Sequence, residues 1–113
     1  MNPKIAIASS DGKNIDLHFA QSYQYYIYEI RDNDYVLLEV RKIRAGFTHD
    51  ENEFDRILTS LKDCIAIVVS RVGYGAVRYI TQSGKRIFEA PYPIAAVLKK
   101  FLQKKILEET NRK

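Results

Sequence analysis

The sequence has no tryptophan, and it has only one cysteine and one methionine among its 113 residues. A single cysteine excludes an internal disulfide, and it is typical of a protein that folds in a reducing cytoplasm. No run reaches the roughly 18 apolar residues that a membrane-spanning helix requires. No apolar leader segment precedes the first predicted strand at Lys4. We therefore expect a cytoplasmic protein that does not cross a membrane.

Length and composition predict one globular domain over residues 1–113. Apolar residues make up 46% of the chain and charged residues 28%, which is a globular rather than a disordered balance. A chain of this length can bury one core, but not two. We expect a monomer or a small homo-oligomer, with residues 109–113 as a frayed tail.

The net charge of +4 is unevenly distributed along the chain. Residues 1–70 contain 8 basic and 11 acidic side chains, whereas residues 71–113 contain 10 basic and 3 acidic ones. The basic residues of the second half are Arg71, Arg78, Lys85, Arg86, Lys99, Lys100, Lys104, Lys105, Arg112 and Lys113. Such a surface suits an anionic ligand, an acidic partner or nucleic acid. For the last fifteen residues, a solvated helix face with a basic tail is the favoured interpretation.

The first part of the chain predicts a buried strand followed by a loop that carries a histidine. Lys4–Ala8 is rich in isoleucine and alanine, and Ser9, Ser10, Asp11 and Gly12 then form a turn signal. His18 and Phe19 follow in the loop. Loops at strand ends are where ligand sites are built, so His18 is a candidate ligand, or else a residue that only caps the loop.

A hairpin of two strands follows this loop. Residues 25–30 and 35–43 alternate in β-branched and aromatic side chains, and the polar turn Arg31–Asp34 joins them. We expect Val36, Leu38 and Val40 to share one face of the second strand. Five of the 8 tyrosines lie between Tyr23 and Tyr35. Base stacking could use them, but a structural role on covered strands is the favoured interpretation.

The second half alternates helices with strands. Apolar spacing predicts a helix over about residues 50–62, with a capping box from Thr48 to Glu51 and His49 exposed in its first turn. The unbroken apolar run Cys64–Val69 is typical of a strand buried on both faces. A last short strand at Arg86–Glu89 precedes Pro93 and an amphipathic helix that continues to about residue 106.

Two glycines lie between the predicted buried strand and the helix at 76–82. Gly73 and Gly75 come directly after Ser70 and Arg71, so backbone N–H groups at a helix start would face an anion there. The third glycine of a dinucleotide-binding fingerprint is absent. The glycine, lysine and serine or threonine of a nucleotide-binding loop are absent too. The turn therefore predicts an anion site that is neither a dinucleotide-binding site nor a nucleotide-binding loop.

These elements predict a three-layer α/β/α sandwich with a mixed five-stranded sheet in the strand order 3-2-1-4-5. In this ribonuclease-H-like arrangement, right-handed crossovers place the switch point between the first and fourth strands. The candidate site lies at the ends of these strands. A nuclease would need several converging carboxylates, and neither central strand carries one. No nucleophile has an evident base, so we expect a protein that is not an enzyme.

The order of motifs resembles the NifX/NifB-type domain of the dinitrogenase iron–molybdenum cofactor biosynthesis family. The resemblance runs through the Ser-Ser-Asp-Gly turn, His18-Phe19, Ile27–Ile30, Asp63–Ser70, Val72–Ala76 and Gly84–Ile94. It covers nearly the whole chain and implies the same ribonuclease-H-like fold. One departure is Ala20, because the family usually has glycine after His-Phe.

The resemblance implies a carrier for an iron–sulfur or iron–molybdenum-type cluster, bound transiently and exchanged with cluster donor or acceptor proteins. His18 would be a metal ligand, with Cys64 the second candidate because thiolate binds iron well. The cofactor-binding residues would be His18, Phe19, Ser10, Asp11, Arg71, Gly73 and Gly75. The alternative is a metal-free regulatory or interaction module that binds a protein, a small anion or nucleic acid. For this chain we expect only weak, non-specific nucleic-acid binding, because no helix carries a set of base-reading side chains.

Overall fold

The computed structural model of the protein describes residues 2–43 and 51–106. Within these residues, five strands are β1 (Lys4–Ala8), β2 (Gln24–Arg31), β3 (Asp34–Lys42), β4 (Ala66–Val69) and β5 (Arg86–Glu89). The helices are α1 (Glu51–Ser60), α2 (Tyr74–Gln82), α3 (Ile94–Lys104) and a short 3₁₀ turn, η1 (Phe19–Gln21). The predicted capping box at Thr48, the position of His49 and the predicted frayed tail lie outside the described residues.

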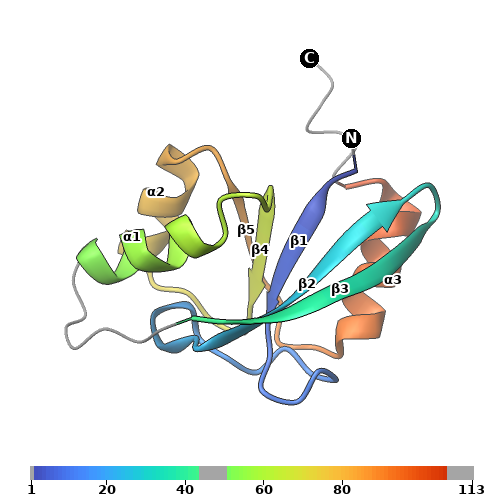
Figure 1. The fold of residues 1–113 in the computed structure, drawn as a ribbon, viewed down its shortest axis with the longest axis horizontal. Coiled ribbons are helices and arrows are strands. Elements are labelled where there is room, and N and C mark those ends of the chain that lie inside the picture. Colours follow the sequence, from blue (N-terminus) through green and yellow to red (C-terminus); the bar gives the residue numbers. More distant parts are fainter. Residues whose placement is uncertain (1, 44–50, 107–113) are drawn as a thin grey trace.

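The strands form one mixed sheet in the order β3-β2-β1-β4-β5, which confirms the predicted topology (Figure 1). β2 is antiparallel to both β1 and β3, as the short turn after Arg31 predicted. β4 is parallel to β1 and to β5, and Ile7 lies opposite Val68 in this register. The carboxyl ends of β1, β4 and β5 therefore meet at one edge of the sheet.

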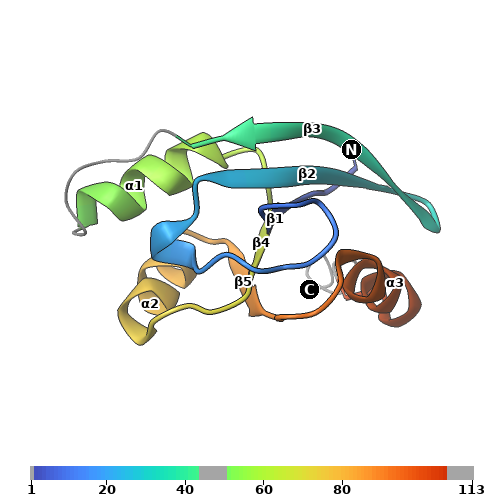
Figure 2. The ribbon, with the colours of Figure 1, turned by 90° about the horizontal axis from the view of Figure 1, so that it is seen from below.

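Helices cover both faces of the sheet, α1 and α2 on one side and α3 on the other (Figures 1 and 2). The alternation of β1 accounts for the two cores, because successive side chains of a strand point to opposite faces. Ile5 and Ile7 pack into the cluster under α3, whereas Ala6 and Ala8 belong to the cluster under α1 and α2. The small alanines share their cluster with the large, fully buried ring of Tyr25.

Several predicted element boundaries differ from the structure by one or two residues. β4 begins at Ala66 and not at Cys64, because the Cys64 N–H donates to the Leu61 carbonyl and continues the turn after α1. α2 begins two residues earlier than predicted, at Tyr74. β3 includes Asp34, which the sequence placed in the turn.

The expectation that Val36, Leu38 and Val40 share a face of β3 is wrong. The register between β2 and β3 shifts after Ile27, so that Tyr28 lies opposite Leu37 and Tyr26 lies opposite Val40. Leu38 is the extra residue of this β-bulge. Leu37 and Val40 consequently lie on the α3 face, while Val36 lies on the other.

We predict that alanine at either of two glycines with positive φ lowers the free energy of unfolding, and that the loss differs between the two positions. Gly12 (φ +77°) and Gly84 (φ +91°) both adopt a backbone that alanine disfavours by about 1–2 kcal/mol. A Cβ at Gly12 would also lie 2.8 Å from the ring of Tyr26, whereas nothing lies within 4 Å at Gly84. Gly12→Ala should therefore lower the free energy of unfolding more than Gly84→Ala, as measured by urea denaturation. Equal losses would contradict the close packing of the loop on Tyr26.

Candidate functional site

The loop that carries His18 is hydrogen-bonded to the end of β4. The Phe19 N–H donates to the Arg71 carbonyl (2.9 Å), and the Ser70 N–H donates to the Leu17 carbonyl (2.9 Å). His18 and Arg71 therefore form a parallel bridge, although they are far apart in the sequence. These bonds place an exposed imidazole and an exposed guanidinium beside each other at the predicted switch point.

A buried pair of hydroxyls holds the same loop from below. The Ser22 hydroxyl donates to the Phe19 carbonyl (2.7 Å) and also bonds the Tyr25 hydroxyl (2.7 Å). Burial raises the pKa of Tyr25 above its ordinary value, so its phenol stays protonated. Tyr25 therefore has a structural role, as was favoured for the tyrosines of this region.

The start of α2 leaves backbone N–H groups without a side-chain cap. Gly73 is the N-cap residue and makes no side-chain cap bond, and the Val77 N–H makes the first helical bond, to the Gly73 carbonyl (3.0 Å). The N–H groups of Tyr74 to Ala76 precede that bond. A Cβ built at Gly73 or Gly75 meets nothing within 4 Å. An anion can therefore approach this positive helix end closely.

His18, Arg71 and the start of α2 line one cleft of about 560 Å³. Its residues come from the loop after β1, from α1, from the turn after β4, from the start of α2 and from the end of β5. They are His18, Ala20, Gln21, Phe54, Arg71, Val72, Gly73, Gly75, Ala76 and Glu89. The structure thus brings together four predicted site residues: His18, Arg71, Gly73 and Gly75. It also places Ala20, which stands where the family has glycine, on the wall of the cleft.

Glu89 is a residue of the cleft that the sequence reasoning missed. Its carboxylate accepts a hydrogen bond from the Val72 N–H (2.9 Å) and so supports the turn that leads into α2. It also places a negative charge among groups that favour anions. The sequence contained a signal for it, because Glu89 ends β5 at the same sheet edge as Ser70.

Three predicted cofactor-binding residues are not brought into the cleft. The Asp11 carboxylate accepts the N–H groups of Lys13 (2.8 Å) and Asn14 (2.9 Å), while Ser10 bonds the carboxylate of Asp16. Both residues fix the turn after β1. Phe19 is 1% exposed and packs against Phe54 with ring centroids 5.7 Å apart. It belongs to the core beneath the loop.

Cys64, the second candidate metal ligand, lies before β4, at the opposite end of that strand from Arg71. Its side chain is 1% exposed, and burial raises the pKa of the thiol to about 12. The Lys85 ammonium donates to the Cys64 carbonyl (2.6 Å), which adds to the packing there. The structure does not bring Cys64 together with His18.

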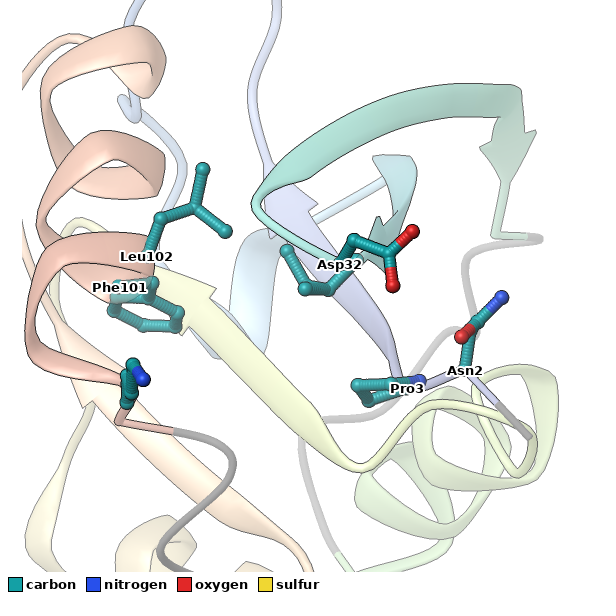
Figure 3. Close-up of a pocket in the computed structure, with 7 residues that line it drawn as sticks. Asn2, Pro3, Asp32, Phe101 and Leu102 are labelled. Carbon is teal, nitrogen blue, oxygen red and sulfur yellow. The ribbon is translucent and has the colours of Figure 1, made fainter.

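The described residues offer no metal-ligand cluster elsewhere that would compete with His18. Among them, no three His, Cys, Asp or Glu side chains are grouped so that they could hold a metal ion. A smaller hollow of about 200 Å³ lies between the carboxyl end of α3 and the β2–β3 turn, where Asp32 and Phe101 contribute to its lining (Figure 3). Among residues 2–43 and 51–106, no helix is long and apolar enough to cross a membrane.

The basic residues of the second half do not gather at the cleft. Arg71 lines it, but Lys99, Lys100 and Lys104 lie on α3, on the other face of the sheet. Arg86 donates to the Ile106 carbonyl (2.9 Å) and lies over the ring of Phe88. The excess of positive charge is therefore spread over both faces of the protein.

Comparison with known proteins assigns the chain to a family. The sequence signature described as "Dinitrogenase iron-molybdenum cofactor" matches residues 1–104. The chain belongs to this dinitrogenase iron–molybdenum cofactor family. The resemblance seen in the sequence is thereby confirmed.

Two relatives of this family member are named Protein NifX. That of Klebsiella pneumoniae is 26% identical over 88 residues, which are 78% of this chain and 56% of that protein. That of Rhodobacter capsulatus is 31% identical over 104 residues, which are 84% of this chain and 65% of that protein. The chain thus spans less than two-thirds of the length of either relative.

Solved structures share the fold of this dinitrogenase-cofactor family member. A putative dinitrogenase from Methanocaldococcus jannaschii aligns with a TM-score of 0.63 at 19% identity, over 92% of this chain and 91% of that one. The protein PH0822 aligns with a TM-score of 0.67 at 20% identity, over 89% of each chain. At this level of identity the likeness concerns the fold alone.

The structural role of Asp11 predicts a pH dependence of stability. Bonds from the N–H groups of Asn14 and Lys13 lower the pKa of Asp11 from 3.8 to about 2. Because the pKa is lower in the folded chain, the ionised carboxylate stabilises the fold at pH values above about 4. This contribution to the unfolding free energy is lost as the pH falls from about 4 to about 2. Asp11→Asn keeps an acceptor oxygen but does not titrate, so its unfolding free energy should fall less over that range. Parallel pH profiles for the parent and the variant would contradict this role.

Proposed function

We propose that this domain binds an iron–sulfur or iron–molybdenum-type cluster, or its precursor, and passes it between donor and acceptor proteins in nitrogenase cofactor biosynthesis. The observation that carries the proposal is the single cleft in which His18, Arg71 and the uncapped start of α2 meet. Family membership and the two NifX relatives support this class of cargo. The cargo would bind transiently.

The chemistry of the cleft suits a large anionic cluster. The imidazole of His18 offers a nitrogen that can ligate iron, and the Arg71 guanidinium supplies positive charge. The N–H groups at the start of α2 can donate to sulfide or other anionic groups. Because neither Gly73 nor Gly75 has a side chain, cargo can approach the backbone there.

The same cleft supports weak and reversible binding. Among the described residues that line the cleft, His18 provides the one imidazole, and none provides a thiol. One ligand does not hold a cluster firmly, and the Glu89 carboxylate repels an anionic cargo. A carrier must release its cargo to an acceptor, so both features fit transfer better than storage.

We further propose that the domain is a binding protein and not an enzyme. The side chains that line the cleft include no hydroxyl or thiol that could act as a nucleophile. They include one carboxylate, Glu89, whereas a magnesium-dependent nuclease needs several. This carboxylate already accepts the Val72 N–H.

We predict that His18→Ala loses most of the cluster-dependent absorption after anaerobic reconstitution. The substitution removes the one imidazole of the cleft. Because His18 is exposed, the free energy of unfolding should change by no more than about 0.5 kcal/mol. Visible absorption and iron content measure uptake, and thermal unfolding measures stability. A parent chain that takes up no cluster would refute the carrier proposal itself.

Cys64→Ala is the matched control for that experiment. Removal of a buried thiol from the core should lower stability, while cluster uptake stays close to that of the parent. If uptake is lost in Cys64→Ala and kept in His18→Ala, the ligand assignment is reversed. Tight, sequence-selective retention of nucleic acid at physiological salt by a cluster-free chain would instead favour the metal-free alternative.

A second prediction tests whether cargo contacts the backbone N–H groups at the start of α2, with a variant that should not lose stability. Gly75→Ala adds a methyl group to the wall of the cleft, in free space and within the first turn of α2. Alanine favours a helix over glycine by up to about 1 kcal/mol, so the variant should melt at the same temperature or higher. Its cluster uptake should nevertheless decrease, since the methyl group keeps cargo away from the N–H groups. Unchanged uptake would mean that the start of α2 does not contact the cargo.

A further inference from the structure

The outer edge of β3 is long and exposes several apolar side chains between charged residues. β3 pairs with β2 on one side, and no described strand pairs with its other side (Figure 2). Three of its large apolar side chains are exposed, Leu37 by 46%, Leu38 by 39% and Val40 by 41%. An edge of this kind exposes a row of backbone donors and acceptors together with apolar surface, and proteins usually cover it.

The bulge at Leu38 puts two of the exposed apolar side chains on the same face of the sheet. Leu37 lies opposite Tyr28 and Val40 lies opposite Tyr26, so both lie on the α3 face. Leu38 is the extra residue between them, and Glu39 pairs with Arg41. We call the exposed Leu37, Leu38 and Val40 the apolar strip of the edge strand.

The ends of β3 carry opposite charges. Asp34 begins the strand and Lys42 ends it, and both are exposed. Arg41, next to Lys42, is already engaged with Asp63 (2.8 Å) and with the Ser60 carbonyl (2.8 Å). In an antiparallel pair centred near Leu38, the Asp34 end of one strand meets the Lys42 end of the other. Two-fold symmetry makes this contact twice.

We propose that β3 pairs antiparallel with β3 of a second copy of the chain, which forms a homodimer with one continuous sheet. The new pair joins the two apolar strips at the two-fold axis and satisfies the outer backbone groups of both strands. No residue of β3 lines the cleft at His18, so the dimer leaves both clefts open. The proposal is independent of the cluster-carrier function.

The first test uses sedimentation equilibrium of the intact chain from low micromolar to millimolar concentration. A pairing of two short strands is a small interface, so we expect a reversible dimer. Leu38→Lys places a charge at the axis in both copies and should raise the dissociation constant at least about tenfold. Ile65→Lys is the matched control, because Ile65 is 36% exposed and lies outside β3. It should dimerise like the parent.

The second test swaps the end charges and does not disturb the apolar strip. Asp34→Lys and Lys42→Asp each bring like charges together twice in the dimer, and each should weaken it. The double variant restores opposite charges at both ends and should recover the affinity of the parent. Thermal unfolding of each variant establishes that the monomer remains folded.

Several outcomes would overturn the proposal. A parent chain that stays monomeric at millimolar concentration would do so, and the edge would then be left for a strand from a different protein. A dimer that survives Leu38→Lys as well as it survives Ile65→Lys would place the contact on another surface. If the double variant dimerises as weakly as the single variants, the proposed antiparallel arrangement is wrong.

Discussion

The site depends on two backbone hydrogen bonds that join residues 17–19 to the end of β4. β1 and β4 are parallel, so both strands end at the same edge of the sheet, and the loop after β1 returns there to pair with Ser70 and Arg71. This pairing sets His18 beside Arg71. The hydroxyl pair of Ser22 and Tyr25 then fixes the loop from the core side. The loop that lines the cleft is thus held by the same kind of backbone pairing that joins the strands of the sheet.

Much of the fold could be predicted because its signals are local. The polar turn after Arg31 is short enough that the flanking strands must be antiparallel, and the apolar run before Ser70 requires cover on both faces. Right-handed crossovers then leave few alternative strand orders. The location of the site followed from this order, because the ends of two parallel neighbours had to meet.

The remaining details depend on contacts that the sequence does not display. Ser10 and Asp11 have the composition of a binding loop, yet their partners, the Asp16 carboxylate and the Asn14 N–H, lie within the loop itself. The bulge at Leu38 depends on how β2 and β3 twist together, and a period of two cannot show where a residue is added. The predicted last strand ends at Glu89, but the contact of Glu89 with the turn before α2 depends on the register between β4 and β5.

The opposition between Glu89 and Arg71 explains how one cleft can both attract and release an anion. A site built for tight binding would surround its cargo with donors only, because each unscreened carboxylate raises the free energy of a bound anion. Here the carboxylate is retained, and it holds the turn that presents Gly73. The same group thus shapes the donor site and weakens it. In the proposed carrier, the affinity for cargo would depend on this balance between the donors and Glu89.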